Sequence, residues 1–264
     1  MNRRTFIGTS AAAIALPTFS KNTSKKLRVG VIGHTGRGNY GHGLDTVWLK
    51  VPETEIVAVA DAHAGGLEKA KKKLQINKGY NDYRTMLKEM KPDIIAVCPR
   101  HVDQHHDMAL AAIESGARGI YIEKPFVRTP AEVDSLASAC EKHRTKIAIA
   151  HRNRWHPMLA IIDKFMTDGH LGKLLEIRAR GKGDRRGGGE DLWVLGSHIM
   201  NLIHYFGGAP RTCSARMFQD GKPVTATDVK PGNEGLGPLA GNELHARYEM
   251  KRGMIAYFAS IAND

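Results

Sequence analysis

Short apolar runs alternate with longer stretches of helical periodicity between residues 27 and 150. The runs predict five strands, at residues 27–32, 55–60, 93–98, 119–123 and 146–150. The stretches between them predict helices around residues 40–50, 65–75, 82–90, 103–115 and 130–143, the last starting with a capping box of Thr129, Pro130 and Glu132. Strands that alternate with helices are typical of βαβ units. The pattern therefore predicts an α/β domain with a doubly wound parallel sheet that binds a nucleotide.

The pattern changes after Ala150. It predicts helices near residues 157–168 and 192–206, and strands near residues 174–180, 211–218, 243–250 and 254–260. Residues 220–242 form a loop rich in glycine and proline, and loops of this length are usually functional or disordered. We therefore expect an α+β domain over residues 151–264, after a first domain over residues 26–150. The chain ends in or just after a strand, and the family resemblance described below implies further strands. We therefore expect this second domain to be incomplete or shortened, with an exposed sheet edge.

Residues 1–25 fit neither domain. Arg3 and Arg4 are followed by Phe6 and by an apolar run to about Leu16 that is too short to span a bilayer. A twin arginine before such a run is typical of a Tat signal peptide. We expect residues 1–25 to be this signal, the Tat translocase to be a partner and the protein to be periplasmic; a frayed N-terminal helix is the alternative. No other apolar stretch reaches membrane-spanning length.

Composition removes several classes of function. The net charge of +12 is compatible with anionic ligands, but the basic residues are scattered and no nucleic-acid motif is present, so we expect no nucleic-acid partner. Cys98, Cys140 and Cys213 lie far apart and outside any CxxC motif, which favours three small buried side chains. His101 and His105 are four residues apart, but no further zinc ligand is evident, so we expect no metal site.

A glycine-rich turn, GHTGRGNYGHG, follows the first strand. Gly33, Thr35 and Gly38 match the dinucleotide-binding fingerprint with its middle glycine replaced, and such a turn brings a pyrophosphate to a helix N-terminus. Asp61 ends the second strand, where a carboxylate can accept hydrogen bonds from the adenosine ribose. No arginine follows in Ala62 or His63. The turn therefore predicts a nicotinamide cofactor, NAD in preference to NADP.

The fifth strand runs into an EKP motif formed by Glu123, Lys124 and Pro125. Ligands bind at the carboxyl ends of strands in open parallel sheets, and a lysine there can stabilise negative charge on a substrate oxygen. With VGVIGHTGRG, VAVAD, NDYRTML, CPR…HHDMALAAIESG, LGKLLEIRARG and GGGEDLWVLGSHIMN, the motif makes residues 27 to 260 resemble the Gfo/Idh/MocA family. The resemblance implies a Rossmann domain followed by an open-faced sheet domain. It also implies NAD(P)-dependent hydride transfer on sugars, cyclitols or related polyols, and a homo-oligomer if the sheet domain is complete.

The resemblance also implies which residues form the site. Lys124 and His198 would be catalytic, Arg154 would face the substrate, and the cofactor would be bound by Gly33, Thr35, Gly38, Asp61, His106 and Glu123. Asn201 is added by its spacing, since it follows His198 by three residues on the same helix face and fits a substrate-positioning role. His198 would take the proton from a substrate hydroxyl while Lys124 stabilises the alkoxide.

One position departs from the family. Members commonly have an aspartate four residues before the catalytic histidine, and this chain has Val194 there. Asp191 lies about 10 Å from His198 along a regular helix, so we expect it to be the helix N-cap, with Leu192 first in the helix. Glu190 is expected in the preceding loop.

Three functions remain open from the sequence. The first is an exported dehydrogenase of sugars or polyols. The second is a lyase or glycosidase that oxidises its substrate transiently, with no net redox change. The third is a non-catalytic NAD-binding protein, suggested by Val194 and the short C-terminus. The sequence does not identify the substrate.

Overall fold

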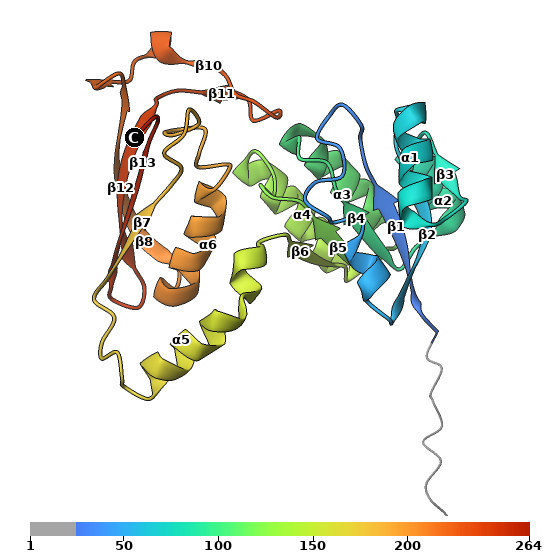
Figure 1. The fold of residues 1–264 in the computed structure, drawn as a ribbon, viewed down its shortest axis with the longest axis horizontal. Helices are drawn as coiled ribbons and strands as arrows, with labels where there is room; N and C mark the ends of the chain where they lie inside the picture. Colours follow the sequence, from blue (N-terminus) through green and yellow to red (C-terminus); the bar gives the residue numbers. More distant parts are fainter. Residues whose placement is uncertain (1–24) are drawn as a thin grey trace, which may run out of the picture.

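The computed structural model describes residues 25–264, and the predicted Tat signal therefore lies almost entirely outside the described residues. Two sheets form the two halves of the molecule, joined by the short helix η3 (Arg152–Trp155) and by α5 (Pro157–Thr167) (Figure 1). The first sheet has six parallel strands in the order β3-β2-β1-β4-β5-β6. Their bounds are β1 Leu27–Ile32, β2 Thr54–Ala60, β3 Gly79–Tyr80, β4 Ile94–Val97, β5 Gly119–Ile122 and β6 Lys146–Ile149. This is the predicted doubly wound α/β fold, with β3 as an additional short edge strand.

Helices cover both faces of this sheet, which explains why its central strands are apolar without alternation. On one face, α2 (Tyr83–Met90), α3 (His105–Glu114) and α4 (Pro130–His143) pack on Ile32, Ile95 and Ile122. On the other face, α1 (Ala64–Leu74) packs on Val29 and Val31. The predicted capping box of α4 is confirmed, since Thr129 and Glu132 bond each other's backbone amides.

The predicted helix at residues 40–50 is wrong. Turns occupy residues 40–46, and only the 3-10 helix η1 (Val47–Lys50) follows. Gly36, Gly38, Gly41 and Gly43 all have positive φ angles, which a right-handed helix does not allow. The glycines that make the turn open therefore also prevent a regular helix from starting behind it.

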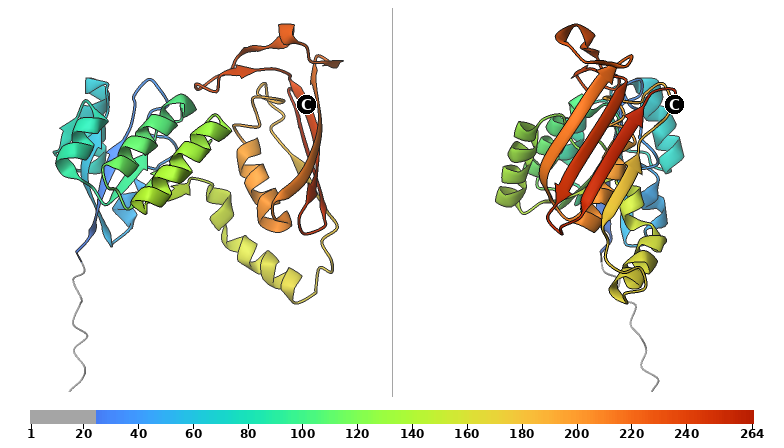
Figure 2. Two further views of the ribbon diagram at one scale, coloured as in Figure 1. Left: turned by 180° about the vertical axis from the view of Figure 1, so that it is seen from behind. Right: turned by 90° about the vertical axis from the view of Figure 1, so that its left-hand side faces the viewer.

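The second half contains a mixed sheet with one helix on its inner face. The strand order is β7-β13-β12-β8-β9, with β7 parallel to β13 and the other pairs antiparallel. The strands are β7 Glu176–Arg180, β8 Pro210–Gln219, β9 Lys222–Pro223, β12 Glu243–Met250 and β13 Ile255–Ile261. Helix α6 (Gly196–Gly207) lies between this sheet and the first half (Figure 2). The α+β fold predicted for the second half, a mixed sheet with helices, is confirmed.

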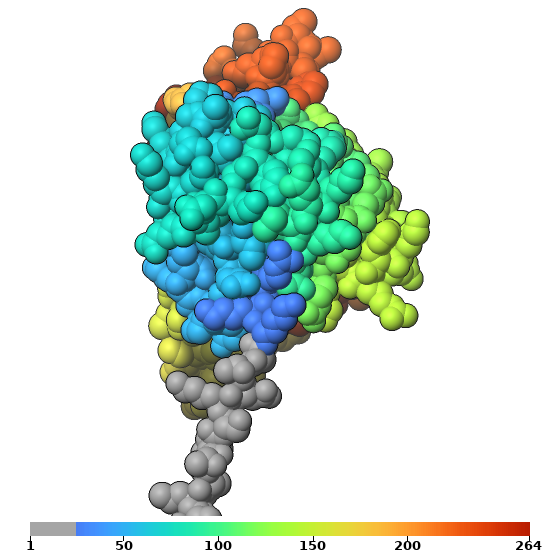
Figure 3. Space-filling model, turned by 90° about the vertical axis from the view of Figure 1, so that its right-hand side faces the viewer, coloured from blue at the N-terminus to red at the C-terminus, as the bar shows by residue number. Residues whose placement is uncertain are grey.

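The long loop at residues 220–242 reaches back to the first half. It contains η4 (Ala226–Asp228), β10 (Lys230–Pro231) and β11 (Pro238–Leu239), and it stands above the helices of the first half in Figure 3. The Val102 amide donates to the Glu234 carbonyl at 3.1 Å, and Arg100 pairs with the Glu234 carboxylate at 3.2 Å. The loop thus connects the two halves beside the carboxyl ends of the parallel strands.

Two smaller expectations need correction. Cys98 is buried as predicted, but Cys140 is only partly buried and Cys213 is exposed on β8. Helix α6 begins at Gly196 rather than at Leu192. No helix within residues 25–264 is long and apolar enough to cross a membrane.

Candidate active site

Lys124 and His198 lie close enough at the junction of the two halves for the lysine charge to act on the histidine. Lys124 lies two residues after the end of β5, and its Nζ donates a hydrogen bond of 3.0 Å to the backbone oxygen of Val194. Val194 lies in the turns just before α6, whose first turn carries His198. The position that carries an aspartate in the resembled family therefore supplies a backbone carbonyl that holds the lysine. Because the carbonyl does not depend on the side chain, valine is compatible with this contact.

A second histidine lies against His198. His151 follows β6, and its Nδ1 lies 3.4 Å from the Nδ1 of His198. The two rings are 5.3 Å apart between centroids and nearly perpendicular, at 83°. The sequence reasoning missed His151, although its position after the last parallel strand was a signal that could have identified it.

Burial and the nearby positive charges favour the neutral form of His198. Burial, reinforced by the nearby Lys124 and His151, lowers the pKa of His198 to about 4. Burial and Lys124 also lower the pKa of His151. Burial lowers the pKa of Lys124, although Glu123 opposes this shift. At neutral pH the site therefore contains neutral imidazoles beside a lysine, so His198 is available as a base.

The two predicted substrate residues have different surroundings. The Asn201 Oδ1 atom is buried and has no hydrogen-bond partner among the described residues. A buried amide oxygen without a donor can accept a bond from a ligand hydroxyl. Arg154 stacks instead on the ring of Tyr205, with its guanidinium carbon 4.1 Å from the ring centroid. Asn201 therefore retains an unused acceptor, whereas the Arg154 guanidinium is already stacked on an aromatic ring.

Asp191 is a buried structural residue. Its carboxylate accepts from the Lys182 amide at 2.7 Å, the Ser260 hydroxyl at 2.9 Å and the Leu195 amide at 3.2 Å. The prediction that it caps a helix starting at Leu192 is wrong, because turns continue to Leu195. The carboxylate instead holds the α6 entry against β13. Glu190, in the loop as expected, accepts two bonds from Asn233 on the long loop.

The glycine turn after β1 is tied to Asp61. The Asp61 carboxylate accepts from the Thr35 hydroxyl at 2.6 Å, the Tyr40 hydroxyl at 2.8 Å and the His63 amide at 2.9 Å. Asp61 is only 1% exposed. The Tyr40 ring also lies so close to Gly33 that a Cβ there would be 2.2 Å from it. In this structure Asp61 thus holds the turn, and a bond to a ribose would require Thr35 or Tyr40 to release it.

A cavity of about 320 Å³ opens beside this turn. It lies at the carboxyl ends of β1, β2 and β3, and its lining includes Gly33, Asp61, Ala62, Arg37 and Arg84. Its position and volume suit the adenosine part of a dinucleotide. A larger and mostly apolar cavity of about 640 Å³, between α5, α6 and β7, includes neither Lys124 nor His198.

Glu123 contacts His42 of the glycine-rich loop. The Glu123 carboxylate is 2% exposed and lies 3.4 Å from the His42 amide and 3.6 Å from the His42 ring. Glu123 therefore anchors the glycine-rich loop to the end of β5. His42 is a second residue that the sequence reasoning missed.

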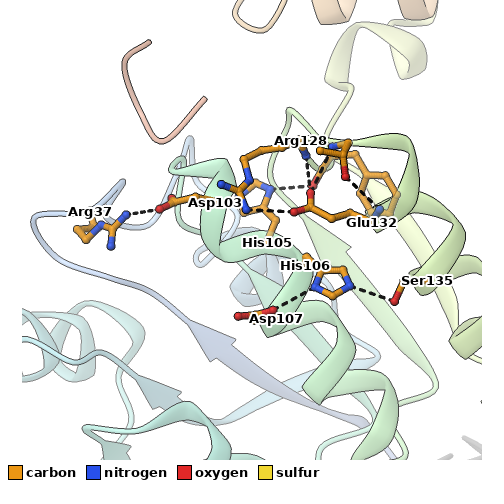
Figure 4. Close-up of polar contacts among 10 residues, drawn as sticks. Arg37, Asp103, His105, His106, Asp107, Arg128, Glu132 and Ser135 are labelled. Carbon is orange, nitrogen blue, oxygen red and sulfur yellow. Dashed lines mark hydrogen bonds and ion pairs between the residues drawn. The ribbon is translucent and has the colours of Figure 1, made fainter. Parts of the chain in front are cut away.

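His106 lies between α3 and α4. Its ring bonds Ser135 of α4 at 3.1 Å and the adjacent Asp107 at 3.0 Å (Figure 4). The buried His105 instead contacts the carbonyls of Pro99 at 2.6 Å and Pro125 at 2.8 Å. His105 thus joins the loop after β4 to the EKP loop, and the structure gives no support for a cofactor contact by His106. No cluster of three potential metal ligands occurs within residues 25–264.

Comparisons with known proteins agree with the fold. Residues 27–151 match the model of an oxidoreductase family with an NAD-binding Rossmann fold. D-glucoside 3-dehydrogenase of Escherichia coli K12 is 26% identical over 216 residues, which cover 76% of this chain and 60% of that protein. D-apiose dehydrogenase of Paraburkholderia graminis is 26% identical over 125 residues, which cover 47% of this chain and 33% of that protein.

The same fold occurs in a solved oxidoreductase from Agrobacterium radiobacter, in complex with NAD⁺, L-tartaric acid and magnesium. The match covers 90% of this chain and 67% of that chain, with a TM-score of 0.71 and 16% identity. At this identity the likeness shows the fold alone. The chain spans only 30% to 60% of the lengths of the curated relatives that it matches.

Proposed function

We propose that this chain is an NAD(P)-dependent dehydrogenase of the Gfo/Idh/MocA type, acting on CH–OH groups; the match of residues 27–151 to the family model supports the proposal. Its substrate would be a sugar, cyclitol or related polyol. The observation that carries the proposal is that Lys124, bonded to the Val194 carbonyl, lies close enough to His198 for its charge to act on that ring. Asn201, on the same helix as His198, adds an unpartnered amide oxygen. The dehydrogenases named above act on sugars or glycosides, as their names state.

The chemistry follows from the protonation states. Neutral His198 takes the proton of the substrate hydroxyl, and the Lys124 ammonium stabilises the negative charge that develops on the same oxygen. A bound nicotinamide would supply the hydride acceptor. Asn201 would hold a neighbouring hydroxyl through Oδ1. Arg154 is assigned a substrate contact by the resemblance alone, and its stacking on Tyr205 makes it the weaker member of the set.

The first half has space for the cofactor, with one adjustment. The 320 Å³ cavity would take the adenosine, and Gly33, Thr35 and Gly38 form the turn at which the pyrophosphate would bind. The loop has no helix N-terminus behind it, so backbone amides of the turn would bind the phosphates. Asp61 would reach the ribose after Tyr40 moves, and Arg37 and Arg84 at the cavity wall require NADP to be tested beside NAD.

The test begins with cofactor binding. NAD⁺ and NADP⁺ are titrated into the purified protein, and thermal unfolding and tryptophan fluorescence are recorded. A saturable rise in the midpoint is expected for at least one cofactor. If neither cofactor binds, the dehydrogenase proposal fails. A sugar and polyol panel then follows with the cofactor that binds. Net NAD(P)H supports dehydrogenation, whereas a changed sugar without NAD(P)H supports the transient-oxidation lyase.

The proposal extends to location. We propose that residues 1–25 direct export by the Tat route to the periplasm, supported by Arg3, Arg4 and the apolar run that follows. Export of a folded protein suits an enzyme that binds its cofactor before it leaves the cytoplasm. The dinucleotide-binding part would then span residues 26–150 and the substrate-binding part residues 151–264, with the latter forming the contact in a homo-oligomer.

A further inference from the structure

His151 is the titratable side chain closest to the proposed base, and the mechanism above gives it no role. It follows β6 in the first half, whereas His198 lies on α6 in the second half. The two Nδ1 atoms face each other at 3.4 Å. Among the described residues, neither Nε2 makes a hydrogen bond, so each ring has one nitrogen directed at its partner and one left free.

Two facing Nδ1 atoms restrict the tautomers of the pair. One Nδ1 must carry a hydrogen and the other must accept it, because two lone pairs or two N–H groups would repel. If His151 donates, then the hydrogen of neutral His198 lies on Nε2, and that nitrogen cannot accept a proton from substrate. If His198 donates, its Nε2 is free to act as a base. The productive arrangement is therefore His198 Nδ1–H donating to His151 Nδ1.

We propose that His151 is the positioning partner of His198, and that it provides the path by which the substrate proton leaves. It would take the part that a carboxylate plays beside a catalytic histidine, a part that Val194 cannot fill. The inference rests on the proposed dehydrogenase function. In the step, the substrate O–H proton goes to His198 Nε2, the Nδ1 proton of His198 goes to His151 Nδ1, and the Nε2 proton of His151 goes to water. The substrate C–H electron pair leaves as hydride to the cofactor, so charge and electrons balance.

The surroundings of the pair are cationic. Lys124 from β5, Arg152 from η3 and His42 from the glycine-rich loop act on His198, and Lys124 acts on His151. No carboxylate is among the charged groups that shift either histidine. Two imidazolium ions at this distance would repel strongly, so the pair holds at most one extra proton. A proton received by His198 is therefore readily passed on rather than kept.

The first experiment measures tautomers and needs no turnover. Nitrogen-15 NMR of the histidine side chains is recorded in the wild-type protein and in His151→Phe and His151→Asn. We expect His198 to carry its hydrogen on Nδ1 in the wild type and in His151→Asn, whose amide oxygen still accepts, and to shift to the Nε2–H form in His151→Phe. An unchanged His198 tautomer in His151→Phe would overturn the pairing, even if no substrate had been found.

The second experiment uses the enzyme with its cofactor and substrate. His151→Phe should lower kcat by about 10- to 100-fold, the range seen when the partner that orients a metal-bound histidine is removed, with KM and cofactor affinity unchanged. His151→Asn should restore orientation but not proton exit, so its kcat should recover and its acid limb of kcat against pH should move. Wild-type kcat in His151→Phe would refute the inference. If His151→Phe does not fold, the asparagine variant and wild-type NMR decide it. A wild type without turnover would count against the proposed function, while the NMR result would still judge the pair.

Discussion

The Asp61 carboxylate is the best place to test how the cofactor turn is held. We take Asp61→Asn as the perturbation. Thr35, Tyr40 and His63 supply four donors to this buried group, at 2.6 to 3.1 Å. Burial raises the pKa of Asp61, but the hydrogen bonds from Thr35, His63 and Tyr40 lower it overall. The ionised form is therefore favoured by folding, and removing its charge must cost stability.

The size of the loss follows from the bonds. A hydrogen bond to a charged group contributes about 1.5–3 kcal/mol and a neutral one about 1 kcal/mol. Asparagine keeps the bonds, since the two hydroxyls can turn, but loses the charge assistance of all four, while a neutral group is cheaper to bury. The net expectation is a loss of about 2 kcal/mol in the free energy of unfolding. Because the pKa is lowered, this stability is present above about pH 4 and disappears as pH falls through the native pKa.

Urea unfolding followed by circular dichroism measures this loss, and Asp82→Asn is the matched control. Asp82 accepts from the Arg84 amide and from the amide and hydroxyl of Thr85, at 2.8 to 3.2 Å, but it is exposed at the start of α2. Asparagine caps helices about as well as aspartate, so this control should lose less than about 0.5 kcal/mol. Equal losses in the two variants would refute the reasoning, and so would an Asp61→Asn protein as stable as wild type.

Three further predictions concern other parts of the chain. Gly38→Ala should abolish saturable cofactor binding in the fluorescence titration, because a Cβ would lie 2.2 Å from the Arg100 amide nitrogen. Gly36→Ala is the comparison, since its φ of +86° matches the +90° of Gly38 but its Cβ would have open space. Normal affinity in Gly38→Ala would be the contrary result. The depressed pKa of His198, about 4 against 6.5, means that the unfolded chain binds a proton that the native chain does not. The free energy of unfolding should therefore decrease as pH falls from about 6.5 to about 4, by at most about 3 kcal/mol. His198→Gln should lack this part of the pH dependence. The same pH dependence in wild type and variant would contradict the burial assigned to His198. Replacing Arg3 and Arg4 by lysines should leave the protein in the cytoplasmic fraction of a Tat-competent host, and unchanged export would remove the Tat proposal.

Local patterns predicted most of the fold. The strand at residues 27–32 and the capping box at Thr129 appear as expected, because each is specified by neighbouring residues. The predicted helix at residues 40–50 is wrong because the helical spacing took no account of Gly41 and Gly43, whose φ angles are positive. The start of α6 was misplaced because Asp191 is engaged by Ser260, which is 69 residues away in sequence.

The site was only partly predictable because its contacts join residues that are far apart in the sequence. Lys124 and His198 could be assigned from motifs, but Lys124 is held by the backbone carbonyl of Val194, and a pattern of side chains does not predict a backbone contact. His151 meets His198 across the two halves of the chain, at a sequence separation of 47 residues. Asp61 was identified as a cofactor residue, whereas its bonds to Thr35 and Tyr40 depend on how the turn folds back.

The central claim is that Lys124 and His198 carry the proton chemistry of a cofactor-dependent oxidation. The most direct measurement is the initial rate of NAD(P)H formation at 340 nm with the substrate found in the panel, for wild type, Lys124→Met, His198→Gln and the distant control His106→Gln. Losses of about 100-fold or more in kcat are expected for the first two variants, with cofactor binding retained, and none for His106→Gln. Wild-type rates in Lys124→Met or His198→Gln, under conditions where the wild type turns over, would contradict the account.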